Sequence, residues 1–296
     1  MRRSLRKLNI QLIQMSDAKK VYTLSENSKI KYDGAIRRIK DAGKDLADIP
    51  SVIEWIKTKG GDSAQKVYYS AIKYHLGKEN FPQAYQNEID RLAGTQKVKA
   101  EKQELSTKQV SNFVSYEDLL AVQKRLAAKE DKSDKDWEDY IVASLYTLNP
   151  PVRADYGEVR IFKKRRSTRT GNELIWGQKG DAYFVFRNYK TKTAYGDVEV
   201  RVSPALSAVI TEWFAHLGKT PKWLLGNRAV TPHDLLNYVE HAFKSTKKTV
   251  GINLLRHAYI QHHLPAIATD IEAKKKLSRS MLHSVEKQAE YYSKNV

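Results

Sequence analysis

Two arginines, a histidine and a tyrosine are spaced along the second half of this 296-residue chain in a pattern that could act on a phosphodiester. Arg153 stands in "TLNPPVRADY", Arg256 in "NLLRHAYIQHHL", and His283 precedes Tyr292 by nine residues in "MLHSVEKQAEYY". A phosphodiester under attack gains negative charge, and the planar forks of two arginines match its oxygens. Tyrosine can attack such a group if cations or a base activate it, because its ordinary pKa is about 10.

A proton donor for the leaving 5′ oxygen would complete this set, and lysine is suited to the role. The stretch "FRNYKTKTAYGDVEV" supplies two candidates, Lys190 and Lys192. We favour Lys190 because we expect it at the end of a strand, where its position is better fixed. A covalent phosphotyrosine conserves the energy of the broken bond. This chemistry therefore needs neither a metal nor a nucleotide, and we expect no cofactor-binding or metal site.

The composition favours a nucleic-acid partner. The formal net charge is +18, which favours binding to a polyanion, and nucleic acid is the commonest one; a ribosomal or heparin-like partner is the alternative. The chain has no cysteine, which excludes disulfides, thiolate metal sites and cysteine nucleophiles. No segment has the pattern of a secretion signal or a membrane span. We therefore expect an intracellular, DNA-associated protein of the cytoplasm or nucleus.

The first third of the chain has the pattern of a small helical bundle. Apolar residues recur at helical spacing in four stretches, the last of which we expect to end at Gly94. We therefore predict an N-terminal extension over 1–19 and a helical domain over 20–94. The charged stretch 95–111 is either a linker or a solvated helix that continues the bundle.

The remainder, 112–296, has helices on both sides of a short run of strands. Helical spacing is found in "SYEDLLAVQKRLAAK" and "WEDYIVASLYTL", and alternating stretches follow in "GEVRIFKK", "AYFVFRNYK" and "DVEVRVS". Ser203 with Pro204, and Thr231 with Pro232, are typical helix starts. We predict a mainly α fold with a small antiparallel β-sheet, organised as two domains.

The candidate residues resemble the tyrosine recombinase, or phage integrase-like, family in their types and order. That family has a first Arg, a lysine in a β-hairpin, a His-x-x-Arg box, a Leu-Gly-His box and a Tyr nine residues beyond the last histidine. "TLNPPVRADY" looks most like members from large eukaryotic DNA viruses and mobile elements. The resemblance covers the whole chain. It implies a core-binding domain over 20–94 and a catalytic domain over 112–296 that together clamp double-stranded DNA.

The resemblance implies a site-specific DNA recombinase or integrase that cleaves and rejoins strands. By position, Arg153 and Arg256 would hold the scissile phosphate, and His283 would hydrogen-bond it. Tyr292 would attack to give a 3′-phosphotyrosine, since it is nine residues from His283 whereas Tyr291 is eight.

Two positions depart from the family pattern. Asn253 stands where the His-x-x-Arg box has its histidine; an asparagine can position a phosphate but cannot take a proton near neutral pH. The Leu-Gly-His box reads "MLHS" and lacks its glycine, which we interpret as a mild loss because only the histidine contacts the substrate in the family.

Two alternatives remain for the function. A type IB topoisomerase-like protein would use the same chemistry to relax supercoils without matched sites, and Asn253 favours a catalytically impaired DNA-binding module of the same fold. We expect a homo-oligomer, a tetramer, that forms on DNA. Because four residues follow Tyr292, the nucleophile could act in its own subunit or in a neighbour, and we leave cis and trans cleavage open.

Other polar residues have simpler interpretations. His257, His262 and His263 lack the i, i+4 spacing of a helical metal site. The basic run "KKRRSTR" (163–169) is typical of a loop that contacts phosphates, with a nuclear-import signal as the lesser alternative.

Overall fold

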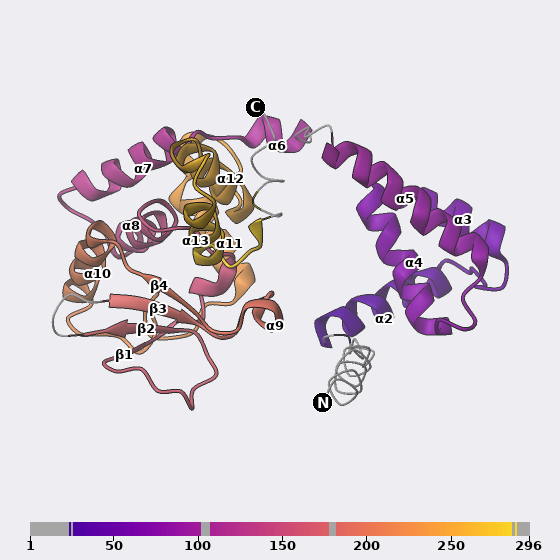
Figure 1. The fold of residues 1–296 in the computed structure, drawn as a ribbon, viewed down its shortest axis with the longest axis horizontal. Coiled ribbons are helices and arrows are strands. Elements are labelled where there is room, and N and C mark those ends of the chain that lie inside the picture. The colour runs from indigo at the N-terminus through magenta and orange to yellow at the C-terminus, as the bar shows by residue number, and fades with distance from the viewer. Residues whose placement is uncertain (1–23, 25, 102–106, 178–181, 286–287, 289–296) are drawn as a thin grey trace, which may run out of the picture. The chain divides into compact units, whose positions relative to one another are not determined.

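The chain forms two compact units, residues 1–101 and 102–296 (Figure 1). The structure is a computed structural model and describes residues 24, 26–101, 107–177, 182–285 and 288. The predicted extension over 1–19 lies outside the described residues. The assignment of the two units to core-binding and catalytic roles stays a prediction.

The described part of the first unit is a helical bundle. Helix α4 packs against α2 and α5, and α3 packs against α4 and α5. Apolar side chains such as Ile39, Ile56 and Ile72 are fully buried between them. The helices are α2 (Glu26–Asp41), α3 (Ile49–Lys57), α4 (Asp62–Leu76) and α5 (Gln83–Glu101).

The predicted end of the last helix at Gly94 is wrong. Helix α5 continues to Glu101, because Gly94 is followed by good helix formers and by no proline. Of the two interpretations of 95–111, a helix that continues the bundle is therefore correct as far as Glu101. A short helix, α6 (Thr107–Asn112), follows in the second unit.

The second unit contains a mixed sheet, with described strands in the order β1-β2-β3-β4. Strand β3 is antiparallel to β2 and β4, but β1 is parallel to β2. The prediction of an antiparallel sheet is thus wrong for the pair β1 and β2, because β2 was not predicted. After β1 the chain runs back to the level at which β1 begins, so that β2 starts with Glu173 beside Arg160 and runs in the same direction as β1. The strands are β1 (Arg160–Phe162), β2 (Glu173–Trp176), β3 (Ala182–Phe186) and β4 (Val198–Arg201).

Helices lie on one side of this sheet in Figure 1. Helix α8 is central to them: all of its residues from Asp139 to Thr147 are buried, and it packs against α7, α10, α11 and α12. The helices, with the 3₁₀ turns η, are α7 (Tyr116–Ala128), α8 (Asp134–Thr147), η1 (Ala154–Tyr156), α9 (Lys192–Tyr195), α10 (Pro204–His216), α11 (Pro232–Ala242), η2 (Lys244–Thr246), α12 (Ile252–His263), η3 (Pro265–Ile267) and α13 (Ile271–Ser280).

The helix starts follow the sequence signals. Ser203 and Thr231 accept hydrogen bonds from backbone N–H groups in the first turns of α10 and α11, each with proline at the start, as predicted. A capping box of Ser133 and Asp136 begins α8. These caps fix where the buried helices enter the core.

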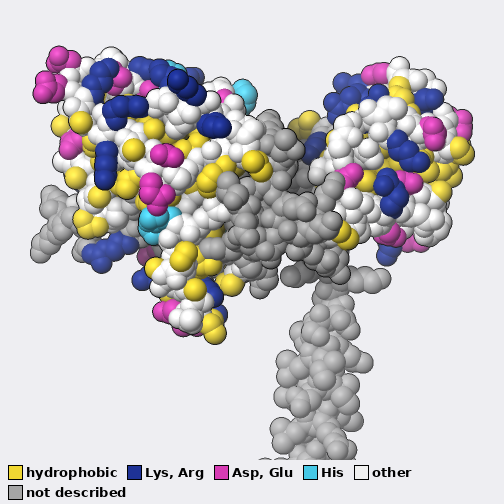
Figure 2. All heavy atoms as spheres, turned by 90° about the horizontal axis from the view of Figure 1, so that it is seen from above, with side chains coloured by type: hydrophobic (Ala, Val, Ile, Leu, Met, Phe, Trp, Pro, Cys, Tyr) yellow, Lys and Arg dark blue, Asp and Glu magenta, His cyan; other side chains and the backbone are white. Residues whose placement is uncertain are grey.

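The surface is rich in basic side chains. Figure 2 shows Lys and Arg side chains spread over the visible faces of both units. A membrane-spanning helix is not found in the described ranges, since none of their helices combines the required length with sufficient hydropathy.

Gly157 provides a test of how tightly η1 packs. A Cβ atom at this position would lie 2.2 Å from the carbonyl oxygen of Val230, whose N–H donates to the Gly157 carbonyl. We expect Gly157→Ala to lower the free energy of unfolding by about 1–3 kcal/mol, because the backbone must shift. Urea unfolding measures this change. The control is Gly171→Ala, where a Cβ meets no atom within 4 Å; equal stability of the two variants would contradict this packing.

Candidate active site

Arg153 is positioned by the segment that joins α8 to η1. It is the residue directly before η1. Two buried tyrosines fix this segment: the Tyr146 hydroxyl donates to the carbonyl of Arg153 at 3.0 Å, and the Tyr156 hydroxyl donates to that of Pro150 at 3.4 Å. The side chain of Arg153 is therefore held half-buried at a fixed point of the fold.

Arg256 lies in α12, and its side chain is fully buried. Its Nη1 donates to the carbonyl of Met281 at 3.1 Å and to that of Pro151 at 3.4 Å. A buried guanidinium requires such acceptors, because removing a charge from water costs several kcal/mol. Arg256 thereby connects the segment before Arg153 to the segment before His283.

The residue before His283 has an unusual backbone. Leu282 has φ 56°, a left-handed conformation that costs a residue other than glycine about 1–2 kcal/mol. Its carbonyl accepts from Arg153 Nη1 at 3.1 Å and from the Thr191 hydroxyl at 3.0 Å. The missing glycine of "MLHS" therefore has a structural consequence: a leucine occupies a conformation that suits glycine.

His283 lies close to both arginines. Its side chain is 2% exposed. Burial, together with the positive charges of Arg256 and Arg153, lowers the pKa of its imidazole to about 3. The imidazole is therefore neutral near pH 7, and a neutral imidazole carries one N–H that can donate a hydrogen bond.

Asp155 is an acidic neighbour of the same arginines. Burial raises the pKa of its carboxyl group, while Arg153 and Arg256 act to lower it. Its Oδ2 is buried and has no hydrogen-bond partner among the described residues. Asp155 thus places a carboxyl group next to the two guanidinium groups.

The lysine candidates lie beside this cluster, although the reason for preferring Lys190 is wrong. Strand β3 ends at Phe186, so Lys190 is in the following turn, and Lys192 is the first residue of α9. Both lysines are exposed. They flank Thr191, whose bond to Leu282 brings this turn to the arginine and histidine cluster.

Asn253 lies one helical turn before Arg256 and is exposed. It lines a cavity of about 490 Å³ together with Arg153 and the start of α12 at Gly251. The N-terminal end of a helix carries partial positive charge, which favours an anion there. Glu240 also lines this cavity, whereas Arg256 and His283 do not.

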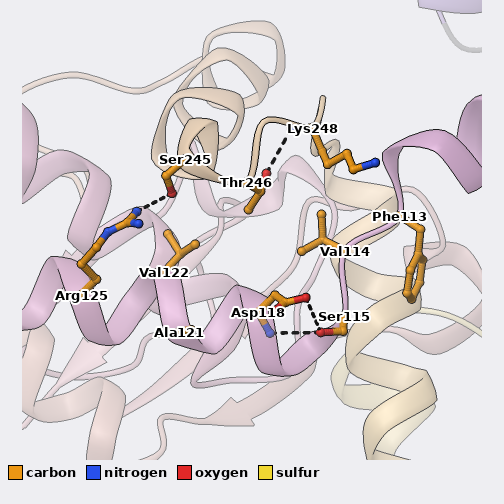
Figure 3. A pocket seen from close by; sticks show the side chains of 10 residues that line it. All are labelled: Phe113, Val114, Ser115, Asp118, Ala121, Val122, Arg125, Ser245, Thr246 and Lys248. Atoms are coloured by element: carbon orange, nitrogen blue, oxygen red, sulfur yellow. Dashed lines mark hydrogen bonds between the residues drawn. The ribbon is translucent and has the colours of Figure 1, made fainter.

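The structure thus brings Arg153, Arg256 and His283 together and places the Lys190 turn and Asn253 next to them. Tyr292, and Tyr291 beside it, lie outside the described residues. A separate cavity of about 680 Å³ is lined by α7, the segment before it and η2. It includes Arg125 and Lys248 but none of the candidate residues (Figure 3).

The other histidines and the basic run lie apart from this cluster or have local partners. His262 contacts Glu117 at 2.6 Å, and the ring of His263 packs at a tilt of 42° against that of Tyr259. In the run 163–169, Arg165 pairs with Glu199, and Arg169 pairs with Glu173 at 3.3 Å.

Three residues that help to form the site were not identified from the sequence. Asp155 is two residues after Arg153 and could have been noticed, since buried arginines need nearby acceptors. Thr191 stands between the two lysines, and its contact with Leu282 has no local sequence signal. The left-handed turn at Leu282 could have been inferred from the glycine that the resemblance expects there.

No protein-family model matches the chain, and no curated protein matches it in sequence.

The low pKa of His283 predicts an acid-sensitive stability. An unfolded histidine takes up a proton near pH 6.5, whereas His283 in the folded chain does so only near pH 3. The unfolded state binds more protons between these values, so the free energy of unfolding falls as the pH is lowered through this window. We expect the free energy of unfolding of His283→Gln to depend less steeply on pH, by up to about 1.4 kcal/mol per pH unit. Urea unfolding of the variant and the unmodified protein at pH 7, 6 and 5 measures this dependence. An identical dependence on pH in the two proteins would refute the low pKa of His283.

Proposed function

We propose that this protein is a site-specific DNA recombinase or integrase that cleaves and rejoins strands through a 3′-phosphotyrosine. The observation that carries the proposal is the convergence of Arg153, Arg256 and His283. These residues lie far apart in the sequence, yet Arg153 and Arg256 donate to adjacent carbonyls in the turn before His283. Two cations beside a neutral imidazole donor form a binding environment suited to a phosphodiester.

The proposed reaction uses groups of the chain and the DNA, with water as the acceptor of one proton. The hydroxyl oxygen of Tyr292 attacks the scissile phosphorus and loses its proton to water, a phosphorus–oxygen bond forms, and the bond to the 5′ oxygen breaks. Lys190 or Lys192 gives its proton to that leaving oxygen. The attack of a 5′ hydroxyl on the phosphotyrosine reverses these steps and rejoins a strand.

Duplex DNA is the partner that the charge distribution favours. The net charge of +18 and the basic side chains spread over both units suit a polyanion. Lys163, Lys164 and Arg166 are exposed on the loop between β1 and β2. We propose that these three side chains contact phosphates of the DNA backbone.

Contact with DNA requires a rearrangement at the site. Arg256 and His283 are at most 2% exposed, so a phosphate can reach them only when the residues that bury them move. Arg153 is half-buried and lines a cavity with Asn253. We therefore infer that a phosphate first meets Arg153 and the start of α12, and that the deeper groups engage afterwards.

A DNA-binding module of the same fold without catalysis is the second candidate. Asn253 favours it, because an exposed amide beside Arg153 can hydrogen-bond a phosphate but cannot act as a base. Formation of a covalent adduct separates the two candidates.

The deciding variants are Tyr292→Phe and its matched neighbour Tyr291→Phe. A duplex sequence selected for binding from a random pool is nicked within its bound region, so that a cleaved end diffuses away and the covalent complex accumulates. We expect Tyr292→Phe to bind this duplex but to form no adduct in a denaturing gel, because the attacking oxygen is gone. Tyr291→Phe should retain the adduct.

The reverse pattern would assign the nucleophile to Tyr291. Absence of any adduct with the unmodified protein, although it binds the duplex, would favour the second candidate.

A further inference from the structure

A buried asparagine, Asn172, joins the two segments that supply Arg153 and the candidate lysines. It directly precedes β2, and its side chain is only 2% exposed. Its position was not singled out by any motif in the sequence. It lies outside the cluster of Arg153, Arg256 and His283, but it contacts the segments on either side of that cluster.

The Asn172 side chain makes four hydrogen bonds to the backbone. Its Oδ1 accepts from the N–H of Arg187 at 3.0 Å and from that of Asn188 at 2.9 Å. Its Nδ2 donates to the carbonyl of Asn188 at 2.9 Å and to that of Asp155 at 3.3 Å. These contacts use both donors and both acceptor positions of the amide.

The bonded groups are close in sequence to the proposed catalytic residues. Asn188 is two residues before Lys190, and Asp155 is two residues after Arg153. The Asn172 backbone carbonyl also accepts from the N–H of Arg160 at the start of β1. A single buried amide therefore holds the turn 187–190 against the segment that carries Arg153.

We propose that Asn172 is a positioning residue for strand cleavage, which sets the distance between the lysine that protonates the leaving oxygen and the arginine that binds the phosphate. The inference rests on the proposed function. Asn172 acts through the backbone and touches no reacting atom. Its removal should therefore affect the proton transfer from the lysine more than the binding of DNA.

Asn172→Asp is the sharpest test, because aspartate has the same shape but no N–H groups. It retains the two acceptor contacts and replaces the two donors with an oxygen that faces the carbonyls of Asn188 and Asp155. We therefore expect the turn to separate from the Arg153 segment while the sheet remains folded.

The experiment compares adduct formation on two nicked duplexes, one with the normal scissile phosphodiester and one with sulfur in place of the 5′ leaving oxygen. When the bond to sulfur breaks, a thiolate leaves without needing a proton. We expect Asn172→Asp to slow adduct formation about 10-fold or more on the oxygen substrate. On the sulfur substrate it should remain within about threefold of the unmodified protein. Lys190→Ala and Lys192→Ala calibrate the assay, and the one rescued by sulfur is the proton donor.

Asn149→Asp is the matched control. Asn149 is 1% exposed and also bridges backbone groups, the carbonyl of Arg201 and the N–H of Ser203. Neither of these hydrogen bonds reaches the turn 187–190. A structural defect at this position should slow adduct formation on both substrates by the same factor.

Hydrogen exchange of the free protein provides a readout that does not require activity. Asn172→Ala removes the oxygen that accepts from the N–H groups of Arg187 and Asn188 and should therefore speed amide exchange at both residues, whereas Asn149→Ala should do so at Ser203. An equal loss on both substrates, or unchanged exchange at 187–188, would overturn the role of Asn172. If the unmodified protein cleaves neither substrate, the proposed function fails, and the role in strand cleavage fails with it. The exchange result then decides separately whether Asn172 fixes the turn.

Discussion

The burial of the Arg256 guanidinium is the constraint on which the rest of the site depends. A full positive charge without solvent exposure must be stabilised by acceptors fixed around it. The carbonyls of Pro151 and Met281 provide this stabilisation. They belong to the segments that lead to Arg153 and His283. The requirement to stabilise one charge thus determines where the other two groups lie.

The same arrangement explains the backbone at Leu282. Its carbonyl accepts from Arg153 and Thr191 at once, which requires the chain to turn sharply before His283. The left-handed conformation of Leu282 provides that turn. Three segments therefore meet at two consecutive carbonyls, those of Met281 and Leu282. Burial lowers the pKa of His283, and the two guanidinium groups that this convergence holds nearby lower it further.

Much of the helical part could be predicted from the sequence, because local signals determine it. Ser203 and Thr231 cap helices through side chains that lie within one turn. The parallel pairing of β1 with β2 could not be predicted, since it depends on where the loop 163–172 returns. Likewise, Asn172 and Thr191 position the site through contacts with distant segments, and no local pattern indicates them. The contact of the site residues with DNA stays a prediction.

The most direct test of the account concerns the charge that Arg153 neutralises. Adduct formation by Arg153→Ala is measured on a nicked duplex with a normal scissile phosphate and on one with a neutral methylphosphonate at that position. Arg160→Ala, an exposed arginine on β1, is the control. If Arg153 stabilises phosphate charge, its loss should slow the reaction about 100-fold on the phosphate and far less on the methylphosphonate, where no charge needs stabilisation. An equal deficit on both substrates, or none on either, would contradict the account.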